Sequence, residues 1–334
     1  MTTSAPARRT YWHLENLGRK PSEYDIVTSK LLFYPERGFE VDTPISEWYA
    51  KYQKGSRLQC KDWDAFRDPR ETTYTKYTEL QKNKETFVDG LLNVVDATGY
   101  DASMTITWRV RLERVLPVLR YPLHGLQMLS AYVGQMAPGG RVVVASALQA
   151  ADEMRRIQRC AYRMRQIQET RATFGADSKT LWQDDPMWQP MRQVIERMLV
   201  TYDFGEAFVA LNFVLKPAFD ELFMVHFARL AASQGDEVLS QIFQSLNEDC
   251  VWHRQWSTAL AAMLVRADVA NHAAMKAWAD QWHEPVMQAV RAFSPLFCEG
   301  LERFAPCPFE TVLSDIDRIC KPEFAIPAPI AVEF

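Results

Sequence analysis

Apolar residues recur at the spacing of an α-helix through most of this chain. Between positions 236 and 266, Val238, Ile242 and Leu246 fall on one stripe of a helix, and Cys250 and His253 continue it. Glycines and prolines separate the periodic segments and mark their ends. The pattern predicts helices at 69–97, 105–116, 122–136, 142–173, 186–201, 206–233, 236–266 and 271–298.

Several of these predicted helices approach 30 residues, whereas a typical helix in a globular protein has about 12. Long helices joined by short connections are typical of a helical bundle. Only 13 of the 334 residues are glycine, which is too few for the many turns of a β-rich or βαβ protein. The sequence therefore predicts an all-α fold.

The two ends of the chain lack this periodicity. Residues 1–70 are rich in proline and aromatic residues and predict an extended N-terminal arm; 71–298 form the bundle, and the proline-rich 299–334 an irregular tail. Aromatic residues in such an arm favour contact with a partner subunit, although an arm that packs on its own bundle is the alternative. The candidate interface residues are Trp12, Tyr24, Tyr34, Trp48, Tyr49, Trp63 and Phe66.

The net charge of the chain bears on whether nucleic acid is a partner. The net charge of −4 does not favour nucleic-acid binding. Helix 142–173 does carry a series of arginines, for which a solvated or subunit-facing side is favoured over a nucleic-acid face. The uncharged run 121–140 contains two prolines, His124 and two glutamines, so it predicts a buried helix and not a membrane span.

The cysteines indicate the compartment. Six are scattered along the chain without any Cys-x-x-Cys pair, which predicts reduced thiols. No apolar run follows Arg8 and Arg9, so no secretory signal is predicted. Both observations indicate a cytoplasmic protein.

Ionisable residues on the apolar faces are the candidates for chemistry. Glu153 falls on the inward stripe of 142–173, Lys216 at the edge of the apolar face of 206–233, and His253 on that of 236–266. A buried charge is costly unless it is paired, so each of these positions needs a partner.

The segments around these residues resemble a known family. Ala151-Asp-Glu-Met-Arg-Arg-Ile-Gln-Arg-Cys-Ala-Tyr and Asp249-Cys-Val-Trp-His are similar to the two Glu-x-x-His helices of bacterial multicomponent di-iron monooxygenases. Lys20-Pro-Ser-Glu-Tyr-Asp-Ile-Val and Gly205-Glu-Ala-Phe-Val-Ala-Leu-Asn extend the resemblance, which covers about 10–290 and is strongest to the hydroxylase β subunit of the toluene and o-xylene type. It implies a ferritin-like, ribonucleotide-reductase-like bundle of long helices.

The resemblance also implies that the metal site is degenerate. Relative to the family's catalytic subunit, Glu153 and His253 are retained, but Arg156 replaces a histidine, and Cys250 and Lys216 replace glutamates. The last ligand is expected from 122–136, which contains no acidic residue. We expect a metal-free core in which Glu153 pairs with Arg156 or Lys216, and His253 is a hydrogen-bonded core histidine; a different retained metal is the alternative.

The function implied is that of a non-catalytic, structural β subunit in an NADH-dependent monooxygenase that oxidises an aromatic or alkene hydrocarbon with O₂. This chain would bind no cofactor: di-iron would lie in a catalytic α subunit, and NADH, flavin and iron–sulfur groups in other components. The expected partners are that α subunit, a small γ subunit and a second αβγ unit, served by an effector protein, a Rieske ferredoxin and a reductase. Toluene, phenol, isoprene and other alkenes are all compatible substrates.

Two other functions remain open from the sequence. One is a self-contained ferritin-like metalloenzyme, such as a ribonucleotide reductase small subunit, which requires a full ligand set. The other is a protein that binds hydrophobic ligands in its core, where phenylalanines between 204 and 227 would line a channel; such a stripe is more often ordinary core.

Overall fold

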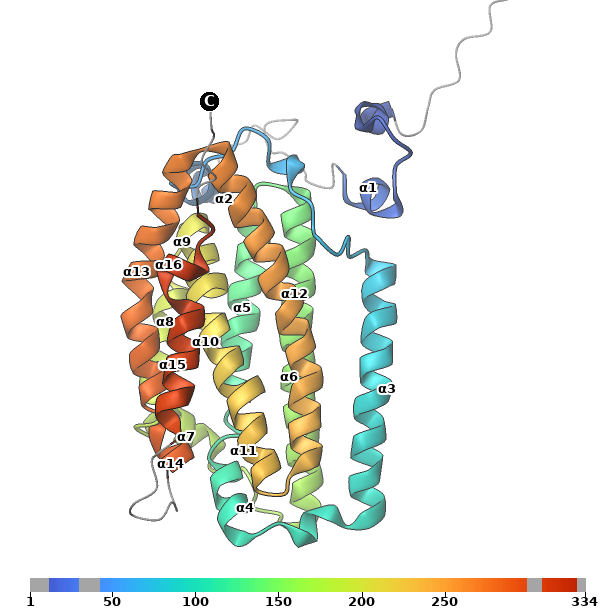
Figure 1. Ribbon diagram of the computed structural model, residues 1–334, viewed down its shortest axis with the longest axis vertical. Coiled ribbons are helices and arrows are strands. Elements are labelled where there is room, and N and C mark those ends of the chain that lie inside the picture. Colours follow the sequence, from blue (N-terminus) through green and yellow to red (C-terminus); the bar gives the residue numbers. More distant parts are fainter. Residues whose placement is uncertain (1–11, 30–42, 299–307, 329–334) are drawn as a thin grey trace, which may run out of the picture.

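The computed structural model describes residues 12–29, 43–298 and 308–328. Every regular element within these ranges is helical, which confirms the predicted all-α class. Figure 1 shows the long helices running side by side along the long axis of the molecule. They are α3 (Tyr74–Thr98), α5 (Arg120–Met136), α6 (Gly140–Thr170), α12 (Glu237–Ala267) and α13 (Val269–Arg291).

The helix predicted at 206–233 lies in the middle of the bundle and has two widened turns. It consists of α9 (Phe204–Val209), α10 (Lys216–Asp220) and α11 (Ala228–Ser233), separated by π-helical segments η6 (Ala210–Leu215) and η7 (Glu221–Phe227). Its residues 207–220 are buried on all sides. Lys216, expected at the edge of the apolar face, is therefore fully inside the protein.

Close backbone contact holds α5 against α6. A Cβ atom at Gly134 in α5 would lie only 3.1 Å from the Cβ of Ser146 in α6, so glycine allows the two helices to approach closely. The chain then reverses at Pro138 and Gly139, as the sequence predicts. This hairpin places Glu153 and Arg156 of α6 beside the central helix.

Several predicted boundaries shift. α3 begins at Tyr74 with Thr73 as its cap, because the carboxylate of Asp68 instead accepts hydrogen bonds from the backbone of Arg70 and Thr72. The remaining helices between α3 and the C-terminal end of the bundle are α4 (Ile106–Glu113), α7 (Ser178–Asp184), α8 (Gln189–Leu199) and α14 (Ser294–Cys298), with a 3₁₀ turn η5 (Tyr100–Ser103).

The interpretation of 299–334 as an irregular tail is wrong for its middle part, where α15 (Phe309–Cys320) and α16 (Pro322–Ala325) form. Apolar residues of α15 are buried at helical spacing: Phe309, Val312, Ile316 and Cys320. Pro308 caps the start of α15 and Pro322 is the first residue of α16, positions where proline is tolerated, so neither prevents a helix.

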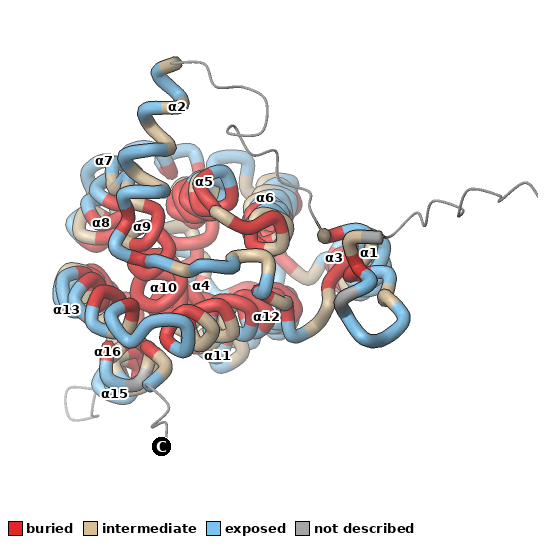
Figure 2. The backbone as a smooth tube through the Cα atoms, turned by 90° about the horizontal axis from the view of Figure 1, so that it is seen from above, coloured by how far each residue is buried: buried red, intermediate tan, exposed pale blue. Residues whose placement is uncertain are grey.

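The described parts of the N-terminal arm contain short helices instead of a fully extended chain: η1 (Trp12–Leu17), α1 (Glu23–Thr28), α2 (Pro44–Tyr49), η3 (Ala50–Lys54) and η4 (Trp63–Ala65). Figure 2 shows α1 beside one side of the bundle and α2 at its end. Asp25 of α1 is tied by ion pairs to Arg67 at 2.6 Å, Arg19 at 2.8 Å and Arg141 of α6 at 3.5 Å.

These contacts correct part of the interface prediction. Tyr24 and Phe66 are 3% and 1% exposed because this chain itself covers them, so assigning them to a partner interface is wrong. Trp48, Tyr49 and Trp63 are half-buried against the core and keep part of their surface exposed. The side chain of Trp12, and Tyr34, lie outside the described residues.

The cysteines depart from the prediction at one position. Cys60, Cys160, Cys250 and Cys320 are free thiols, but Cys298 takes part in a disulfide, so the prediction that all six are reduced is wrong there. Among the described helices, none combines the length and apolarity needed to cross a bilayer.

Candidate functional site

Four charged side chains form a closed cluster at the centre of the bundle. Arg156 Nη1 lies 3.0 Å from Glu153 Oε2 and 2.8 Å from Asp220 Oδ1. Lys216 Nζ lies 2.7 Å from Glu153 Oε1 and 3.0 Å from Asp220 Oδ2. All four side chains are buried. Each carboxylate contacts both cations, so the two formal negative and two formal positive charges of the cluster cancel. The expected pairing of Glu153 with Arg156 or Lys216 is present with both partners.

Mutual attraction keeps Asp220, Lys216 and Arg156 charged. Burial alone would raise the pKa of Asp220, but the charges of Arg156 and Lys216 lower it to about 2. Burial and Arg156 act to lower the pKa of Lys216, yet Asp220 and Glu153 outweigh them and raise it. Burial also opposes the charge of Arg156, but its anionic neighbours hold its pKa well above the usual value.

Cys250 completes the surroundings of Arg156. The guanidinium Nη2 of Arg156 contacts the Cys250 sulfur directly. Burial raises the pKa of the Cys250 thiol far above its usual value, so this sulfur is a neutral thiol. A metal bound at Cys250 would have to displace the thiol proton and stand beside the Arg156 cation.

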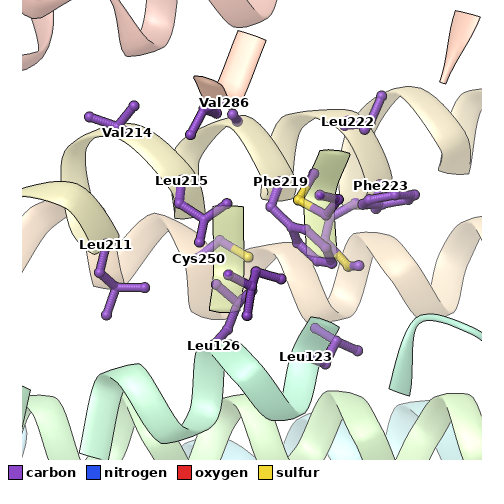
Figure 3. Close-up of a cluster of buried hydrophobic side chains, with 14 of the residues drawn as sticks. Leu123, Leu126, Leu211, Val214, Leu215, Phe219, Leu222, Phe223, Cys250 and Val286 are labelled. Atoms are coloured by element: carbon purple, nitrogen blue, oxygen red, sulfur yellow. The ribbon is translucent and has the colours of Figure 1, made fainter. Parts of the chain in front are cut away.

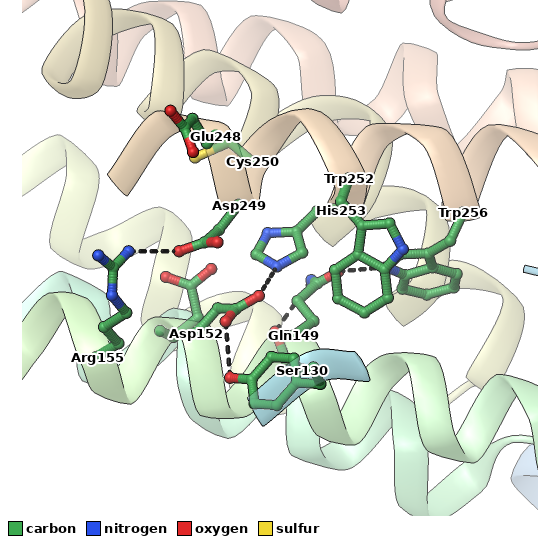
Figure 4. A network of polar contacts seen from close by, with 12 residues as sticks. Ser130, Gln149, Asp152, Arg155, Glu248, Asp249, Cys250, Trp252, His253 and Trp256 are labelled. Atoms are coloured by element: carbon green, nitrogen blue, oxygen red, sulfur yellow. Dashed lines mark hydrogen bonds and ion pairs between the residues drawn. The ribbon is translucent and has the colours of Figure 1, made fainter. Parts of the chain in front are cut away.

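His253 belongs to a neighbouring network. Figure 4 shows its ring and the Asp152 carboxylate pointing toward each other from α12 and α6, with Nε2 2.8 Å from Asp152 Oδ2. Tyr77 and Gln81 of α3 donate to the other oxygen of Asp152, at 2.7 and 2.8 Å. Burial, followed by the charges of Lys216 and Arg156, lowers the pKa of His253 well below its usual value. His253 is thus a neutral, hydrogen-bonded core histidine.

In α5, from which the last ligand of a di-iron site is expected, apolar side chains stand in place of an acidic ligand. Leu123 and Leu126 of α5 lie in the apolar cluster with Leu215, Phe219 and Cys250, as Figure 3 shows. The predicted absence of an acidic ligand on this helix therefore corresponds to an ordinary packed core. The phenylalanines of 204–227 are likewise buried and packed ring to ring.

These residues do not fit a di-iron centre. Such a site offers six carboxylate and imidazole ligands to positive metal ions, whereas here a guanidinium and an ammonium occupy the same core and neutralise both nearby carboxylates. Within the described ranges, no three His, Cys, Asp or Glu residues are arranged to hold a metal ion.

A small cavity adjoins this region. It has a volume of about 20 Å³ and is lined by residues including Tyr77, Gln81, Asp152 and Asp249. That is room for roughly one water molecule, and it is too small for an aromatic hydrocarbon.

The arginines of α6 are used inside the molecule. Arg155 pairs with Asp249 at 2.7 Å, Arg159 with Asp89 at 2.7 Å, and Arg163 hydrogen-bonds Asp101 at 2.7 Å. These partners lie on α12, α3 and η5, so the arginines join α6 to its neighbours. These three arginines give no support to a nucleic-acid face, because their guanidinium groups are already paired.

Two central residues were not found from the sequence. Asp220 follows Lys216 by four positions, a spacing that places both on one helical face, so this signal was available. Asp152 had no comparable signal, because its role depends on Tyr77, Gln81 and His253 from two other helices.

The long helices packed around this buried cluster define a ferritin-like helical bundle (Figure 1). A family model described as Methane/Phenol/Alkene Hydroxylase matches residues 48–268. The chain belongs to this family, which confirms the resemblance and the ferritin-like fold predicted from the sequence.

Relatives agree with this assignment. The hydroxylase component subunit beta of the toluene-4-monooxygenase system of Ectopseudomonas mendocina is 35% identical over 292 residues, covering 85% of this chain and 89% of the relative. The hydroxylase component small subunit of propane 2-monooxygenase from Mycolicibacterium goodii is 26% identical over 278 residues, 78% of this chain and 74% of the relative.

Solved structures are similar as well. A chain from the structure of toluene bound in the resting active site of toluene 4-monooxygenase matches with a TM-score of 0.83 and 33% identity, covering 89% of this chain and 99% of that chain. A chain from phenol hydroxylase of Pseudomonas sp. OX1 shares the fold, with a TM-score of 0.80 and 21% identity over 95% of this chain and 94% of that chain.

Proposed function

We propose that this chain is a non-catalytic, structural subunit of a multicomponent monooxygenase hydroxylase. Relatives named as hydroxylase component subunits of toluene and propane monooxygenase systems support this assignment. The observation that carries the proposal is the cluster of Glu153, Arg156, Lys216 and Asp220, which fills the core with two ion-paired cations.

The cluster favours a structural role for a physical reason. Each of its cations bridges two carboxylates, and together the four residues connect α6 to the central helix. Adding metal ions would place further positive charge beside two buried cations, which is strongly unfavourable. The core of this chain therefore keeps the helices in place without metal.

The chemistry then belongs to other subunits. Di-iron would be held by a catalytic α subunit, which together with a γ subunit and a second αβγ unit would complete the hydroxylase. Electrons from NADH would arrive through a flavin- and iron–sulfur-containing reductase and a Rieske ferredoxin, with an effector protein. The assembled complex would insert one oxygen atom of O₂ into an aromatic or alkene hydrocarbon, in the cytoplasm. Of the predicted interface residues, Trp48, Tyr49 and Trp63 retain exposed surface for a partner.

The proposal can be tested by activity in the assembled complex. The double variant Glu153→Gln/Lys216→Met removes the last carboxylate in a ligand position, together with its cation. We expect turnover per assembled hydroxylase to equal that of the wild type, and also that of the surface control Lys276→Met. Normal assembly with loss of turnover in the double variant alone would show that this core takes part in the reaction.

A further inference from the structure

The two halves of α3 contact the bundle through different chemistry. In the second half, Val88, Leu92 and Val95 are apolar and buried. In 74–87, which we call the α3 strap, no residue is buried. The strap's half-buried side chains are all polar: Tyr77, Gln81, Lys84 and Glu85. Figure 1 shows α3 at the edge of the bundle, against α6 and α12.

The strap is attached to the bundle by hydrogen bonds and ion pairs. Tyr77 and Gln81 donate to Asp152 of α6 at 2.7 and 2.8 Å. Gln81 also donates to Asp249 of α12 at 3.0 Å, and Lys84 pairs with the same carboxylate. The cavity of about 20 Å³ lies in this contact and gives water room beside these groups. Polar contacts that water reaches contribute little to stability.

The bundle side of this contact keeps its partners when the strap separates. Asp152 retains His253 at 2.8 Å, and Asp249 retains Arg155 at 2.7 Å. Arg155 also donates to Ser245 at 3.2 Å. Opening therefore leaves neither carboxylate unpaired, and an unpaired buried charge is the largest cost that such an opening could carry.

The second half of α3 is held more firmly. Separation there would expose Val88, Leu92 and Val95 to water, which is unfavourable. Directly after the helix, Arg163 of α6 donates to Asp101 of η5 at 2.7 Å, and both residues are buried. Breaking a buried pair of this kind is costly. Local opening is therefore expected in the strap and not in the second half.

The backbone at both ends of the strap favours movement. Gly90 lies inside an exposed helix, where glycine is less stable than alanine. A Cβ atom at Gly90 would meet nothing within 4 Å, so packing within the described protein does not require glycine there. At the other end, Glu71 has a φ of 48°, a left-handed conformation that is rare for a residue with a side chain.

The N-terminal arm holds the strained turn at Glu71. Arg67 Nε lies 2.7 Å from Glu71 Oε1, and Arg67 Nη1 lies 2.6 Å from Asp25 of α1. Arg67 thus links the docked helix α1 to the turn that precedes the strap. When α1 leaves the bundle, Arg67 loses Asp25 and the turn at Glu71 loses this support.

We propose that the α3 strap opens from α6 and α12 about Gly90, and that docking of α1 through Asp25 keeps it closed. Binding of another protein to α1 would compete with the Asp25 contacts and so release the strap. The surface along α3 then responds to events at the arm. The strap is a conformational device within this chain, and it goes beyond the structural role proposed above.

Hydrogen exchange of the full chain, followed by mass spectrometry in increasing urea, tests the strap. Once detached, a helix of this length is marginal in water, so its amides exchange. Amides of 78–87 should exchange about tenfold faster than those of 91–98, through an opening with little urea dependence. Raising NaCl from about 0.05 to about 0.5 M should speed exchange in 78–87 about twofold, because salt screens the ion pairs.

Single variants separate the hinge from the arm. Gly90→Ala should slow exchange of 78–87 about fivefold, because alanine stabilises the closed helix. The matched control Asn93→Ala lies in the second half, which stays helical in the open form, and should leave this rate unchanged. Asp25→Asn should speed exchange of 78–87 about threefold. The surface control Asp280→Asn, which removes an exposed ion pair with Lys276, should not.

Each result has an outcome that contradicts the device. Exchange of 78–87 only through global unfolding, with the urea dependence of α12, refutes an opening strap. Equal exchange in both halves of α3 refutes Gly90 as the hinge, as does an equal effect of Gly90→Ala and Asn93→Ala. An unchanged rate in Asp25→Asn refutes the link to the arm. The full chain alone gives these results whether or not a hydroxylase assembles, so they are distinct from a failure of the proposed function.

Discussion

Removing the charge of Lys216 should destabilise the chain far more than removing a surface lysine. The ammonium is buried and lies 2.7 Å from Glu153 and 3.0 Å from Asp220. At an effective dielectric constant of about 20, one such contact corresponds to about 6 kcal/mol of attraction before desolvation. In Lys216→Met this attraction is lost, and Glu153 retains only Arg156 as a partner inside the core.

The expected loss in the free energy of unfolding is about 3–5 kcal/mol, because a buried carboxylate loses one of its two cations. Glu153→Gln/Lys216→Met removes both charges and leaves Arg156 paired with Asp220. It should recover at least about 2 kcal/mol of the loss, a coupling expected for residues in direct contact. The matched surface control is Lys276→Met, whose lysine pairs with Asp280 at 2.8 Å in an exposed position; its cost should stay below about 1 kcal/mol.

Urea unfolding followed by circular dichroism and tryptophan fluorescence measures these differences. The midpoint of Lys216→Met should fall clearly below those of the wild type, the double variant and the surface control. If the effects of Glu153→Gln and Lys216→Met simply add, the two side chains are not coupled and the cluster as described is wrong. A cost equal to that of Lys276→Met would contradict the buried ion pair.

Three further predictions follow from burial and charge. The pKa of Asp220 in the folded chain, about 2, is below its usual value. The ionised carboxylate therefore stabilises the folded chain above about pH 4, and this stabilisation is lost as the pH falls towards 2. In urea titrations, the difference in unfolding free energy between wild type and Asp220→Asn should narrow by about 1 kcal/mol from pH 5 to pH 3. Asp25→Asn should release the segment 12–29 from the bundle, seen as faster proteolysis there with unchanged helicity; equal cleavage rates would contradict the Asp25 ion pairs as an anchor. Ile316→Ala should cost about 2–5 kcal/mol in the same unfolding assay, because this α15 side chain is fully buried; a cost near zero would show that α15 does not pack on the bundle.

The sequence was most informative where periodicity was strong. The helix predicted at 236–266 is found at 237–267, because a long apolar stripe with Asp236 as its cap leaves little ambiguity. The π-helical turns of η6 and η7 were not predicted, since a 100° repeat assumes regular α-helix throughout. α15 was not predicted, since the segment around it is rich in proline, although Pro308 and Pro322 both stand where a helix can begin.

The candidate site was predictable where it depends on spacing within one helix or on the family resemblance. Local spacing brings Glu153 beside Arg156, and the family resemblance indicated Lys216 as a further partner. The second carboxylate, Asp220, shares a helical face with Lys216 but was not predicted as its partner. The pairing of His253 with Asp152 joins two helices that lie far apart in the sequence, so it depends on the packing of the bundle and on no local pattern.

The central claim is that this chain is a structural subunit whose core is occupied by ion pairs and not by metal. Iron analysis tests this most directly: the chain is expressed alone and also isolated within the assembled hydroxylase, in both cases with iron supplied, and iron per polypeptide is measured. The account predicts no stoichiometric iron in the chain alone and stoichiometric iron in the assembly. Two iron atoms per chain in the isolated, folded protein would contradict it.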